Sequence, residues 1–362
     1  MKTNKIIKFV FPALVLVLTS AYFSCDNPTG PIEEQPGRRD YVWTVDTLDM
    51  PMNYLSTVWG SSPNDVWAGG AGGTEYDRLW HYDGNKWKVY NKGPIYCTLN
   101  TLYGFSSNNV WMGGGDGRIW HYDGNRWSQN FRVKVDGSYS ISVDNMWGNS
   151  SNDIYACGTI FYNMGSVYDT LKLKGFVLHY DGSIWKEIVK GPEGFQFLYI
   201  KGEAFIRFIS GSGNVYVYAY NVSKTGDDSV AFYELNGSNL KKIYSNSLGK
   251  ISGANFALIS GKLFFLIGSD VYRYVEEDFI KQFSVSNINF GYYIFGRTSK
   301  DIFINMNDGL AHFNGDNIQY ILKYPSNWNI ISGQVLFENE LFSGFVDSDN
   351  NRNLVLIGKL KK

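Results

Sequence analysis

The feature that most constrains the fold of this chain is a two-part motif that recurs at a near-constant interval. Its first part, residues 59–67, ends in Asn-Asp-Val-Trp, and its second part, residues 79–87, contains His-Tyr-Asp-Gly-Asn-Lys-Trp. The equivalent positions Trp67, Trp111 and Tyr155 follow one another at intervals of 44 residues. A repeating unit of this length buries its apolar surface against its neighbours, so the motif predicts a repeat architecture.

Seven copies of the motif can be aligned along the chain. The first, second, third and sixth copies are clear, because each retains a histidine followed by an Asp-Gly or Asn-Gly turn. The fourth, fifth and seventh copies are degenerate and retain mainly short runs of aromatic and aliphatic residues. In chain order, the alignable parts are residues 59–87, 106–127, 150–185, 212–237, 260–274, 295–315 and 338–357.

Each copy is predicted to form four short antiparallel strands, since the Asp-Gly turn is a strong hairpin signal. We therefore predict an all-β fold, a single β-propeller of seven four-stranded blades. The seventh copy stops one strand short, and residues 41–45 are in phase to supply that strand. Trp43 precedes Trp59 by the same 16 residues that separate Trp87 from Tyr103. Pairing of this strand with the C-terminal strand would close the ring and remove its free edges.

The composition agrees with this architecture and excludes one class of partner. Aromatic residues make up 17% of the chain, which also contains 39 glycines, as expected for pleated strands joined by tight turns. Of its 33 basic residues, three lie within the first eight positions, and 34 residues are acidic. A chain that is slightly acidic beyond its N-terminus lacks the positive surface on which nucleic-acid binding depends.

Residues 1–24 are expected to be a lipoprotein signal peptide rather than part of the fold. Three lysines precede the apolar stretch 9–18, which is shorter than the roughly 20 residues that a membrane-spanning helix needs. The segment Ala21-Tyr22-Phe23-Ser24-Cys25 resembles the lipobox of bacterial lipoproteins, although Tyr22 stands where the family has an aliphatic residue. The resemblance implies that Cys25 is acylated, becomes the mature N-terminus and anchors the protein to a membrane.

Residues 25–40 are predicted to be a flexible tether, and residues 41–362 the propeller. Between positions 26 and 40 the chain has three prolines and two glycines but one aliphatic residue, which is too little apolar surface to order a segment. The expected location is the bacterial cell envelope, as a lipoprotein of the outer membrane or facing the periplasm. The cell surface is the alternative.

The repeat as a whole resembles that of bacterial β-propeller lipoproteins built from Asn-Asp-Val-Trp and His-Tyr-Asp-Gly-x-x-Trp units. It is also similar to the propeller repeats of two-component regulator proteins, through the strand-and-glycine pattern of residues 109–114. The sialidase Asp-box is similar only in outline, because one residue separates Asp from Gly in that motif, whereas the two adjoin in this chain. The resemblance covers residues 41–362 and does not imply sialidase chemistry.

The four histidines of the chain occupy the same position of the repeat, at His81, His121, His179 and His312. A catalytic or metal-binding set has to converge, whereas equivalent positions of a repeat are spread around a ring. We therefore expect structural histidines, by analogy with the polar network of WD-repeat proteins, with bonds to Ser62, Asp65, Ser106, Asp153 or Asp301. The repeat tryptophans are expected to pack in the core; they are residues 59, 67, 80, 87, 111, 120, 127, 147 and 185.

No residue set in the sequence has the pattern of a metal site, a cofactor site or an activated nucleophile. The motifs His-Glu-x-x-His and Gly-x-Ser-x-Gly are absent, and the cysteines lack metal-ligand spacing. We therefore predict no cofactor, no metal and no catalytic residue. Cys97 and Cys157 are expected to be separate buried thiols, with a disulfide as the alternative in an oxidising envelope.

Function is expected where the repeat becomes irregular. The turns that join first to second and third to fourth strands are uniform, whereas the connections between second and third strands and between blades vary. We predict long connections at residues 131–140, 159–174, 191–202 and 221–229. The candidate binding face then consists of Glu75, Tyr76, Asp77, Arg78, Asp116, Arg118, Phe161, Tyr162, Tyr168, Asp169, Lys224, Asp227 and Asp228.

These features favour a lipid-anchored binding or scaffold module whose partner is a protein or a surface polysaccharide. The alternative from another class is a polysaccharide-acting enzyme, a glycosidase or lyase, with Asp77 and Asp169 as a carboxylate pair above the channel. Such a pair would stand about 5 Å apart in a retaining glycosidase and roughly 6.5–9.5 Å apart in an inverting one. A carbohydrate-binding lectin would instead be marked by exposed tryptophans.

Overall fold

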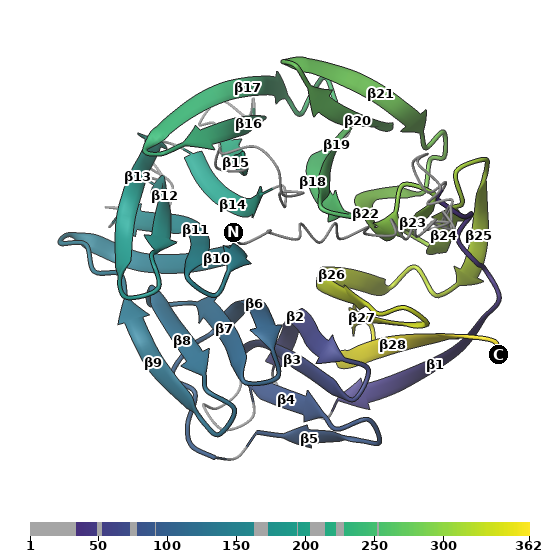
Figure 1. Cartoon of the computed structure of the whole chain (residues 1–362), viewed down its shortest axis with the longest axis horizontal. Coiled ribbons are helices and arrows are strands. Elements are labelled where there is room, and N and C mark those ends of the chain that lie inside the picture. The colour runs from purple at the N-terminus through teal and green to yellow at the C-terminus, as the bar shows by residue number, and fades with distance from the viewer. Residues whose placement is uncertain are drawn as a thin grey trace, which may run out of the picture. The chain divides into compact units, whose positions relative to one another are not determined.

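The computed structural model describes residues 34–48, 53–72, 78–90, 92–162, 173–193, 195–202, 214–221, 228–251 and 253–362. Within these ranges every regular element is a β-strand, and the strands form seven antiparallel sheets of four. The sheets follow one another around a ring, with one strand of each sheet nearest the axis (Figure 1). The predicted seven-bladed β-propeller is therefore confirmed. In the described part of the chain, no helix is long and apolar enough to cross a membrane.

Each blade consists of four strands, which run in order from the axis of the ring outward. The first three blades are β2 (Asn53–Ser62), β3 (Asp65–Gly72), β4 (Leu79–Tyr82) and β5 (Trp87–Val89); β6 (Leu99–Ser106), β7 (Asn109–Gly114), β8 (Arg118–Tyr122) and β9 (Trp127–Arg132); and β10 (Ser138–Ser150), β11 (Asp153–Tyr162), β12 (Leu173–Tyr180) and β13 (Trp185–Glu193). The next two are β14 (Phe195–Gly202), β15 (Val215–Asn221), β16 (Ser229–Asn236) and β17 (Asn239–Ser247); and β18 (Ala254–Ile259), β19 (Lys262–Ile267), β20 (Asp270–Val275) and β21 (Asp278–Ser284). The last two are β22 (Phe290–Thr298), β23 (Asp301–Met306), β24 (Gly309–Phe313) and β25 (Ile318–Lys323); and β26 (Trp328–Leu336), β27 (Glu340–Asp347), β28 (Arg352–Leu360) and β1 (Tyr41–Leu48).

The N-terminal strand closes the ring, as the spacing of the tryptophans predicts. Strand β1 pairs antiparallel with β28 over its whole length, from Tyr41 opposite Leu360 to Leu48 opposite Asn353. Blade seven thus combines the two ends of the folded chain, which lie side by side in Figure 1. The pairing covers the edge of β28 that would otherwise be open and gives blade seven the same four strands as the other blades.

The Asp-Gly turn has the same geometry in every clear copy of the repeat. Asp83 Oδ1 accepts hydrogen bonds from the backbone N–H groups of Asn85 (3.1 Å) and Lys86 (3.0 Å). The following glycine has a left-handed φ, which is +89° at Gly84 and +94° at Gly315, and a side chain would strain the backbone there. The motif therefore fixes where the third strand of each blade turns into the fourth.

The core lies between the blades, and the repeat tryptophans form much of it. Trp67 is 2% exposed, and its ring lies 5.1 Å from Tyr122 and 5.6 Å from Trp127 of the next blade. Trp111 makes the equivalent contacts with Tyr180 and Trp185 of blade three, at 5.1 and 5.7 Å. The nine tryptophans expected to pack in the core are all buried or half-buried, which confirms that prediction and leaves none of them as a sugar-stacking surface.

One of the predicted connections is largely strand, and the described part of another is strand too. Residues 191–202 were expected to be a loop, but β13 runs to Glu193 and β14 begins at Phe195. The segment contains Phe195, Phe197 and Tyr199, and aromatic residues on a half-buried pleated surface favour strand over loop. Residues 159–162 likewise belong to β11, where Phe161 pairs with Leu173 of β12.

The two cysteines of the propeller are both buried, and no disulfide joins them. Cys97 Sγ lies 3.9 Å from the carbonyl oxygen of Gly115, and Cys157 Sγ lies 3.4 Å from that of Phe197. The prediction of two separate thiols is confirmed. Burial raises the pKa of the Cys97 thiol to about 12, against the weaker opposing influence of Arg118 and Arg78. Cys97 is therefore a neutral thiol at physiological pH and not an activated nucleophile.

Candidate functional site

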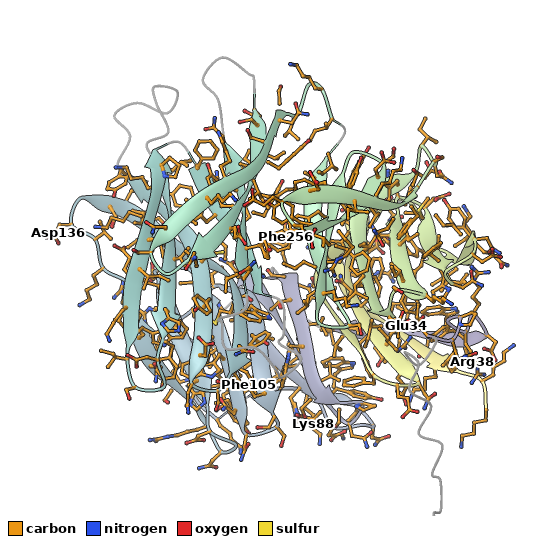
Figure 2. The ribbon with its side chains drawn as sticks, turned by 45° about the horizontal axis from the view of Figure 1, so that its top comes forward. Glu34, Arg38, Lys88, Phe105, Asp136 and Phe256 are labelled. Atoms are coloured by element: carbon orange, nitrogen blue, oxygen red, sulfur yellow. The ribbon has the colours of Figure 1, made fainter. Side chains whose placement is uncertain are left out.

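The repeat gives each blade two different ends. We call the end with the first-to-second and third-to-fourth turns the repeat end, and the end at which the inner strands begin the variable end. Asp136, in the connection between blades two and three, marks the variable end in Figure 2, and Lys88 and Phe105 mark the repeat end. The sequence places the candidate binding face at the variable end and the histidines toward the repeat end.

The histidines each contact a polar residue at the start of the second strand of their own blade. Nε2 of His81, His179 and His312 lies 2.6, 2.8 and 2.7 Å from Oδ1 of Asp65, Asp153 and Asp301. These are three of the expected partners. His121 differs, because its Nε2 lies 2.9 Å from Oδ1 of Asn109 and not beside Ser106. The second strand of blade two begins with asparagine where the other copies have aspartate, so the amide oxygen accepts in place of a carboxylate.

The histidine of blade six, His312, is fully buried and belongs to a larger polar network. His312 is 0% exposed, whereas the side chains of His81 and His179 are 33% and 28% exposed. Asp301 also accepts from Nη1 of Arg297 (2.8 Å), whose guanidinium reaches the hydroxyl of Tyr41 (3.0 Å) and the carbonyl oxygen of Phe337 (2.6 Å). Burial would raise the pKa of Asp301, but the hydrogen bonds from His312 and Arg297 outweigh it and hold the pKa below its usual value.

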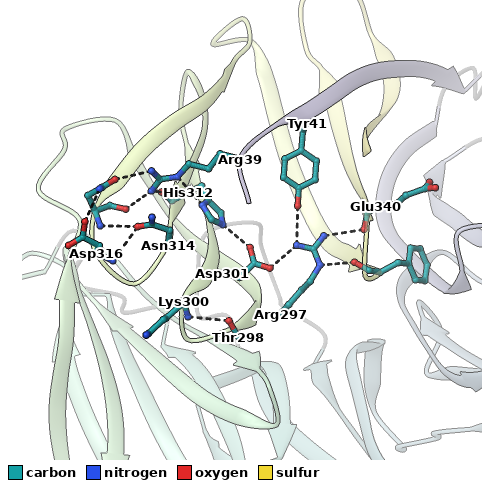
Figure 3. A network of polar contacts seen from close by, with 12 residues as sticks. Arg39, Tyr41, Arg297, Thr298, Lys300, Asp301, His312, Asn314, Asp316 and Glu340 are labelled. Atoms are coloured by element: carbon teal, nitrogen blue, oxygen red, sulfur yellow. Dashed lines mark hydrogen bonds and ion pairs between the residues drawn. The ribbon is translucent and has the colours of Figure 1, made fainter. Parts of the chain in front are cut away.

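The residues just before β1 complete this network (Figure 3). Arg39 donates from Nε to Nδ1 of His312 (3.2 Å), and from Nη2 to the carbonyl oxygens of His312 (3.0 Å) and Asn317 (2.6 Å). Its Nη1 reaches Oδ1 of Asn317 (2.9 Å) and Oε1 of Gln319 (3.0 Å). The N–H of Gly37 also donates to the carbonyl oxygen of Lys300 (2.7 Å). The last residues of the predicted tether therefore contact blade six.

The equivalent surface of blade one does not suit an arginine. The positions of Asn317 and Gln319 correspond there to Lys86 and Lys88, and Lys88 Nζ lies 2.5 Å from Asp83 Oδ2. Two ammonium groups repel a guanidinium, whereas two amide oxygens accept from it. In blade six the histidine network thus binds the residues that precede β1 and helps to close the ring. Its polar groups form hydrogen bonds with one another and do not form a convergent catalytic set.

The structure describes about half of the predicted binding face. Arg78, Asp116, Arg118, Phe161, Tyr162 and Asp228 are described, and the other candidates lie outside the described residues: Glu75, Tyr76, Asp77, Tyr168, Asp169, Lys224 and Asp227. Cys25 and the signal peptide lie outside them too. The proposed carboxylate pair, Asp77 and Asp169, is among those not described.

Three of the described candidates gather between blades one and two. Asp116 is exposed in a left-handed turn with φ of +61°, and its Oδ2 lies 3.8 Å from Nε of Arg118. Arg118 Nη1 donates to Oε1 of Gln129 (3.1 Å). Arg78 Nη1 donates to the carbonyl oxygen of Ile95 at 3.4 Å. Both arginines lie at or just before the start of a third strand and bind different acceptors, so they do not converge on one ligand position.

The remaining described candidates serve the fold at least as much as the surface. Phe161 and Tyr162 end β11 as half-buried strand residues, and Tyr162 packs against the core between blades two and three. Asp228 Oδ2 accepts from the hydroxyl of Tyr220 at 2.5 Å. The expectation that Phe161 and Tyr162 are exposed loop residues was wrong, because cross-strand pairing extends β11 beyond the repeat motif.

The variable end carries exposed aromatic residues that the sequence did not single out. Within the described ranges, the exposed large aromatic side chains are Tyr54 (59%), Tyr96 (51%) and Tyr139 (78%). Tyr54 and Tyr139 are the second residues of the inner strands β2 and β10, and Tyr96 lies in the connection that leads to β6. Ile288, which precedes β22, is 97% exposed at the same end. The signal in the sequence that could have identified them is their position at or just before the start of an inner strand.

A cavity of about 210 Å³ lies within the ring. Its walls come from the inner strands β2, β6, β10, β18, β22 and β26, so it lies on the axis of the propeller. Asn100 and Asn255 are each the second residue of an inner strand, which places part of the wall toward the variable end. The lining residues are Thr57, Val58, Trp59, Asn100, Thr101, Leu102, Tyr103, Asn145, Met146, Asn255, Phe256, Tyr293, Gly333 and Gln334.

No carboxylate lines this cavity in the described part of the chain, so no glycosidase-like pair is seen there. Nor do three or more histidine, cysteine, aspartate or glutamate side chains of the described residues gather as metal ligands. A charged group beside the cavity is Asp144, which adjoins the lining residue Asn145 and contacts the lining residue Asn100. The site is therefore a cavity with polar and aromatic residues in its wall and the carboxylate of Asp144 beside it.

Comparison with known proteins identifies the fold and leaves the family open. No protein-family model matches the chain, and no curated protein matches it. The solved structure of YCF48 bound to D1 peptide is similar, with a TM-score of 0.58 and 15% identity, over 91% of this chain and 100% of that one. The β-propeller domain of Cps50 (Swd1) from Myceliophteria thermophila gives a TM-score of 0.56 and 10% identity, over 86% and 99% of the two chains. YCF48 from Cyanidioschyzon merolae gives 0.52 and 14%, over 87% and 98%.

Proposed function

We propose that this chain is a lipid-anchored binding module of the bacterial cell envelope, whose variable end holds a segment of a protein partner. The observation that carries the proposal is the clustering of the exposed tyrosines Tyr54, Tyr96 and Tyr139 at that end. Tyrosine offers a large rigid contact area and a hydrogen-bonding group at low entropic cost, and it is enriched in protein interfaces. The repeat end has no exposed tyrosine among the described residues.

Two further observations support a protein partner. The propeller fold is shared with YCF48, which has been solved bound to a peptide, and a ring of inner-strand ends is a surface on which an extended segment can lie. The buried or half-buried state of the repeat tryptophans removes the feature that would mark a lectin. The anchoring part of the proposal is supported by the lipobox-like segment that ends in Cys25.

Site-specific photo-cross-linking in cells tests the proposal. The cross-linking residue would replace Tyr139 at the variable end in the full chain, with Lys88 at the repeat end as the matched control position. We expect a discrete cross-linked protein from position 139 that is absent from position 88. The same products from both positions, or none from position 139, would contradict the proposed binding face.

The same strain tests the anchor. Replacing Cys25 by serine should move the protein from the membrane fraction to the soluble fraction, because the acyl chains that hold it would be absent. Retention of the Cys25→Ser protein in the membrane fraction would contradict anchoring through this residue.

A further inference from the structure

The central cavity has a chemical bias that becomes clear from the groups in its wall. Asn100 uses its amide nitrogen, because Nδ2 donates to Ser142 Oγ (2.7 Å), to Asp144 Oδ1 (3.3 Å) and to the carbonyl oxygen of Val143 (3.4 Å). Three acceptors around one nitrogen fix the orientation of this amide. Its oxygen Oδ1 therefore remains as an acceptor that no donor of the described residues reaches.

Gln334 repeats this arrangement on the wall contributed by blade seven. Its Nε2 donates to the carbonyl oxygen of Ile331 (2.7 Å), and its Oε1 is buried without a hydrogen-bond partner. An unpaired buried acceptor carries a desolvation penalty unless a donor reaches it. Asn255 is the opposite case. Its Oδ1 accepts from the N–H of Phe256, so its amide nitrogen is the group that remains as a donor. Acceptors still outnumber donors among these amides.

Asp144 adds a formal negative charge beside the cavity. It sits at a β-bulge of the inner strand β10, and Ser56 and Asn100 sit at the bulges of β2 and β6, at the same repeat position. Its carboxylate accepts from Ser142 Oγ (2.5 Å), Thr159 Oγ1 (3.1 Å) and Asn100 Nδ2 (3.3 Å). All three donors are neutral. Among the residues the structure describes, no lysine, arginine or histidine pairs with it.

The rest of the wall suits a positive guest as well. Trp59, Tyr103, Phe256 and Tyr293 contribute to the lining, and the faces of aromatic rings attract ammonium and guanidinium groups. A carboxylate next to a low-dielectric cavity also concentrates a negative potential there. A volume of about 210 Å³ holds several water molecules at about 30 Å³ each, which is ample for the end of a basic side chain.

We propose that the central cavity binds an organic cation that donates N–H hydrogen bonds, carried by an arginine or lysine side chain of the partner's segment. The cation would lie between the free oxygens of Asn100 and Gln334, with the charge of Asp144 behind Asn100. That the cation belongs to a partner's segment rests on the proposed function. That the ligand is a cation rests on the groups that line the cavity. Bulges that re-aim side chains beside a binding site are a known use of such irregularities.

Titration calorimetry of the full chain with capped tripeptides tests the chemistry. The probes are acetyl-Gly-Arg-Gly-amide and its neutral near-isostere in which citrulline replaces arginine. We expect the arginine peptide to bind about tenfold or more tightly than the citrulline peptide at pH 8, as charge-assisted hydrogen bonds require. Equal affinities would overturn the proposal.

The variant Asp144→Asn should remove most of that preference and leave the citrulline peptide unaffected. Asp136→Asn is the matched control, because it removes one exposed negative charge from the variable end without touching the cavity. A loss of preference in both variants would assign the selection to the negative potential of the surface, and a loss in neither would overturn the role of Asp144.

The wild-type protein offers a second test that needs no variant. Burial raises the pKa of Asp144 to about 6, which the hydrogen bonds from Ser142, Thr159 and Asn100 only partly offset. These partners come from β10, β11 and β6, and none of them titrates in this range. The arginine peptide should therefore bind at least threefold more weakly at pH 5 than at pH 8, and the citrulline peptide should bind equally. A flat profile for arginine would contradict the role of Asp144.

Two outcomes separate this inference from the proposed function. Methylguanidinium is the free counterpart of the arginine probe, and a markedly higher affinity than that of the arginine peptide would assign the cavity to a small free cation and overturn the partner as its source. A specific cross-link from position 139, combined with no arginine preference, would leave the proposed function standing and overturn the cavity inference alone.

Discussion

The two ends of the propeller use polar residues in opposite ways. At the repeat end, Asp65, Asp153 and Asp301 each meet a histidine, and Asp83 binds the amides of its own turn. Beside the central cavity, Asp144 has no cationic partner among the described residues, and burial raises its pKa. The paired aspartates of the repeat end stabilise the folded protein, whereas the charge of Asp144 destabilises it.

This contrast separates residues that build the ring from residues that are available for binding. Desolvation of a half-buried carboxylate without a counter-charge is costly, and perturbed titratable groups beside cavities mark candidate sites. The network of Arg39, His312 and Asp301 shows the other extreme, because every member has a partner within the chain. Substitutions at the two ends should therefore have effects of different kinds.

The largest effect is expected from Asp301→Ala. It leaves His312 and Arg297 with buried, unpaired donors, and breaking such a network costs about 3–5 kcal/mol. The equivalent change in blade one, Asp65→Ala, removes the contact with the partly exposed His81 and should cost about 1 kcal/mol. Urea denaturation of both variants measures the difference. Equal losses would mean that blade six has no special closing role.

A smaller effect is expected from Arg39→Ala. This variant removes five hydrogen bonds to blade six, but residues before β1 gain conformational freedom, so the net loss should be about 1–2 kcal/mol. The neighbouring Arg38 forms exposed contacts with Asp40 and with the carbonyl oxygen of Lys361 (2.6 Å), and Arg38→Ala is expected to lower the unfolding midpoint less than Arg39→Ala does. Thermal unfolding compares the two. A larger shift for Arg38→Ala would refute the assignment of Arg39 as the residue that docks the segment.

The smallest effect on stability is expected at the exposed tyrosines. Changing Tyr54, Tyr96 and Tyr139 to serine should alter the free energy of unfolding by about 0.5 kcal/mol or less at each position, as for surface positions in general. The triple variant should nevertheless lose the cross-link from the variable end, with the cross-linking residue moved to Asp136. Marked destabilisation together with an intact cross-link would reverse the roles that we assign to the two ends.

Much of the fold was predictable because the repeat motif occurs several times in the sequence. The interval between Trp67 and Trp111 set the blade, and the phase of Trp43 placed β1 beside β28. The segment 191–202 was misjudged because the fourth copy lacks the motif, and its strand pairing depends on neighbours distant in sequence. Repeats thus predict architecture well where they are regular and poorly where they decay.

The candidate site was predictable only as a region. Irregular connections pointed to the variable end, but the cavity depends on inner strands of six blades that meet at the axis. Asp144 looks like any strand residue, and its bulge appears only through pairing with β11. The contact between Arg39 and His312 joins residues 273 positions apart, and composition alone suggested a tether there. Such contacts have no local signature in the sequence.

The stability of Asp144→Asn relative to the wild type, measured at pH 8 and at pH 4, tests the central claim most directly. The folded-state pKa of about 6 lies above the ordinary value of 3.8, so protonation stabilises the folded wild type as pH falls from about 6 to about 4. At pH 8 the variant should be more stable by about 1–3 kcal/mol, because it lacks the uncompensated charge. At pH 4 this advantage should be largely lost. A variant that is less stable than the wild type at pH 8 would mean that Asp144 belongs to the structural set and that the contrast between the two ends is wrong.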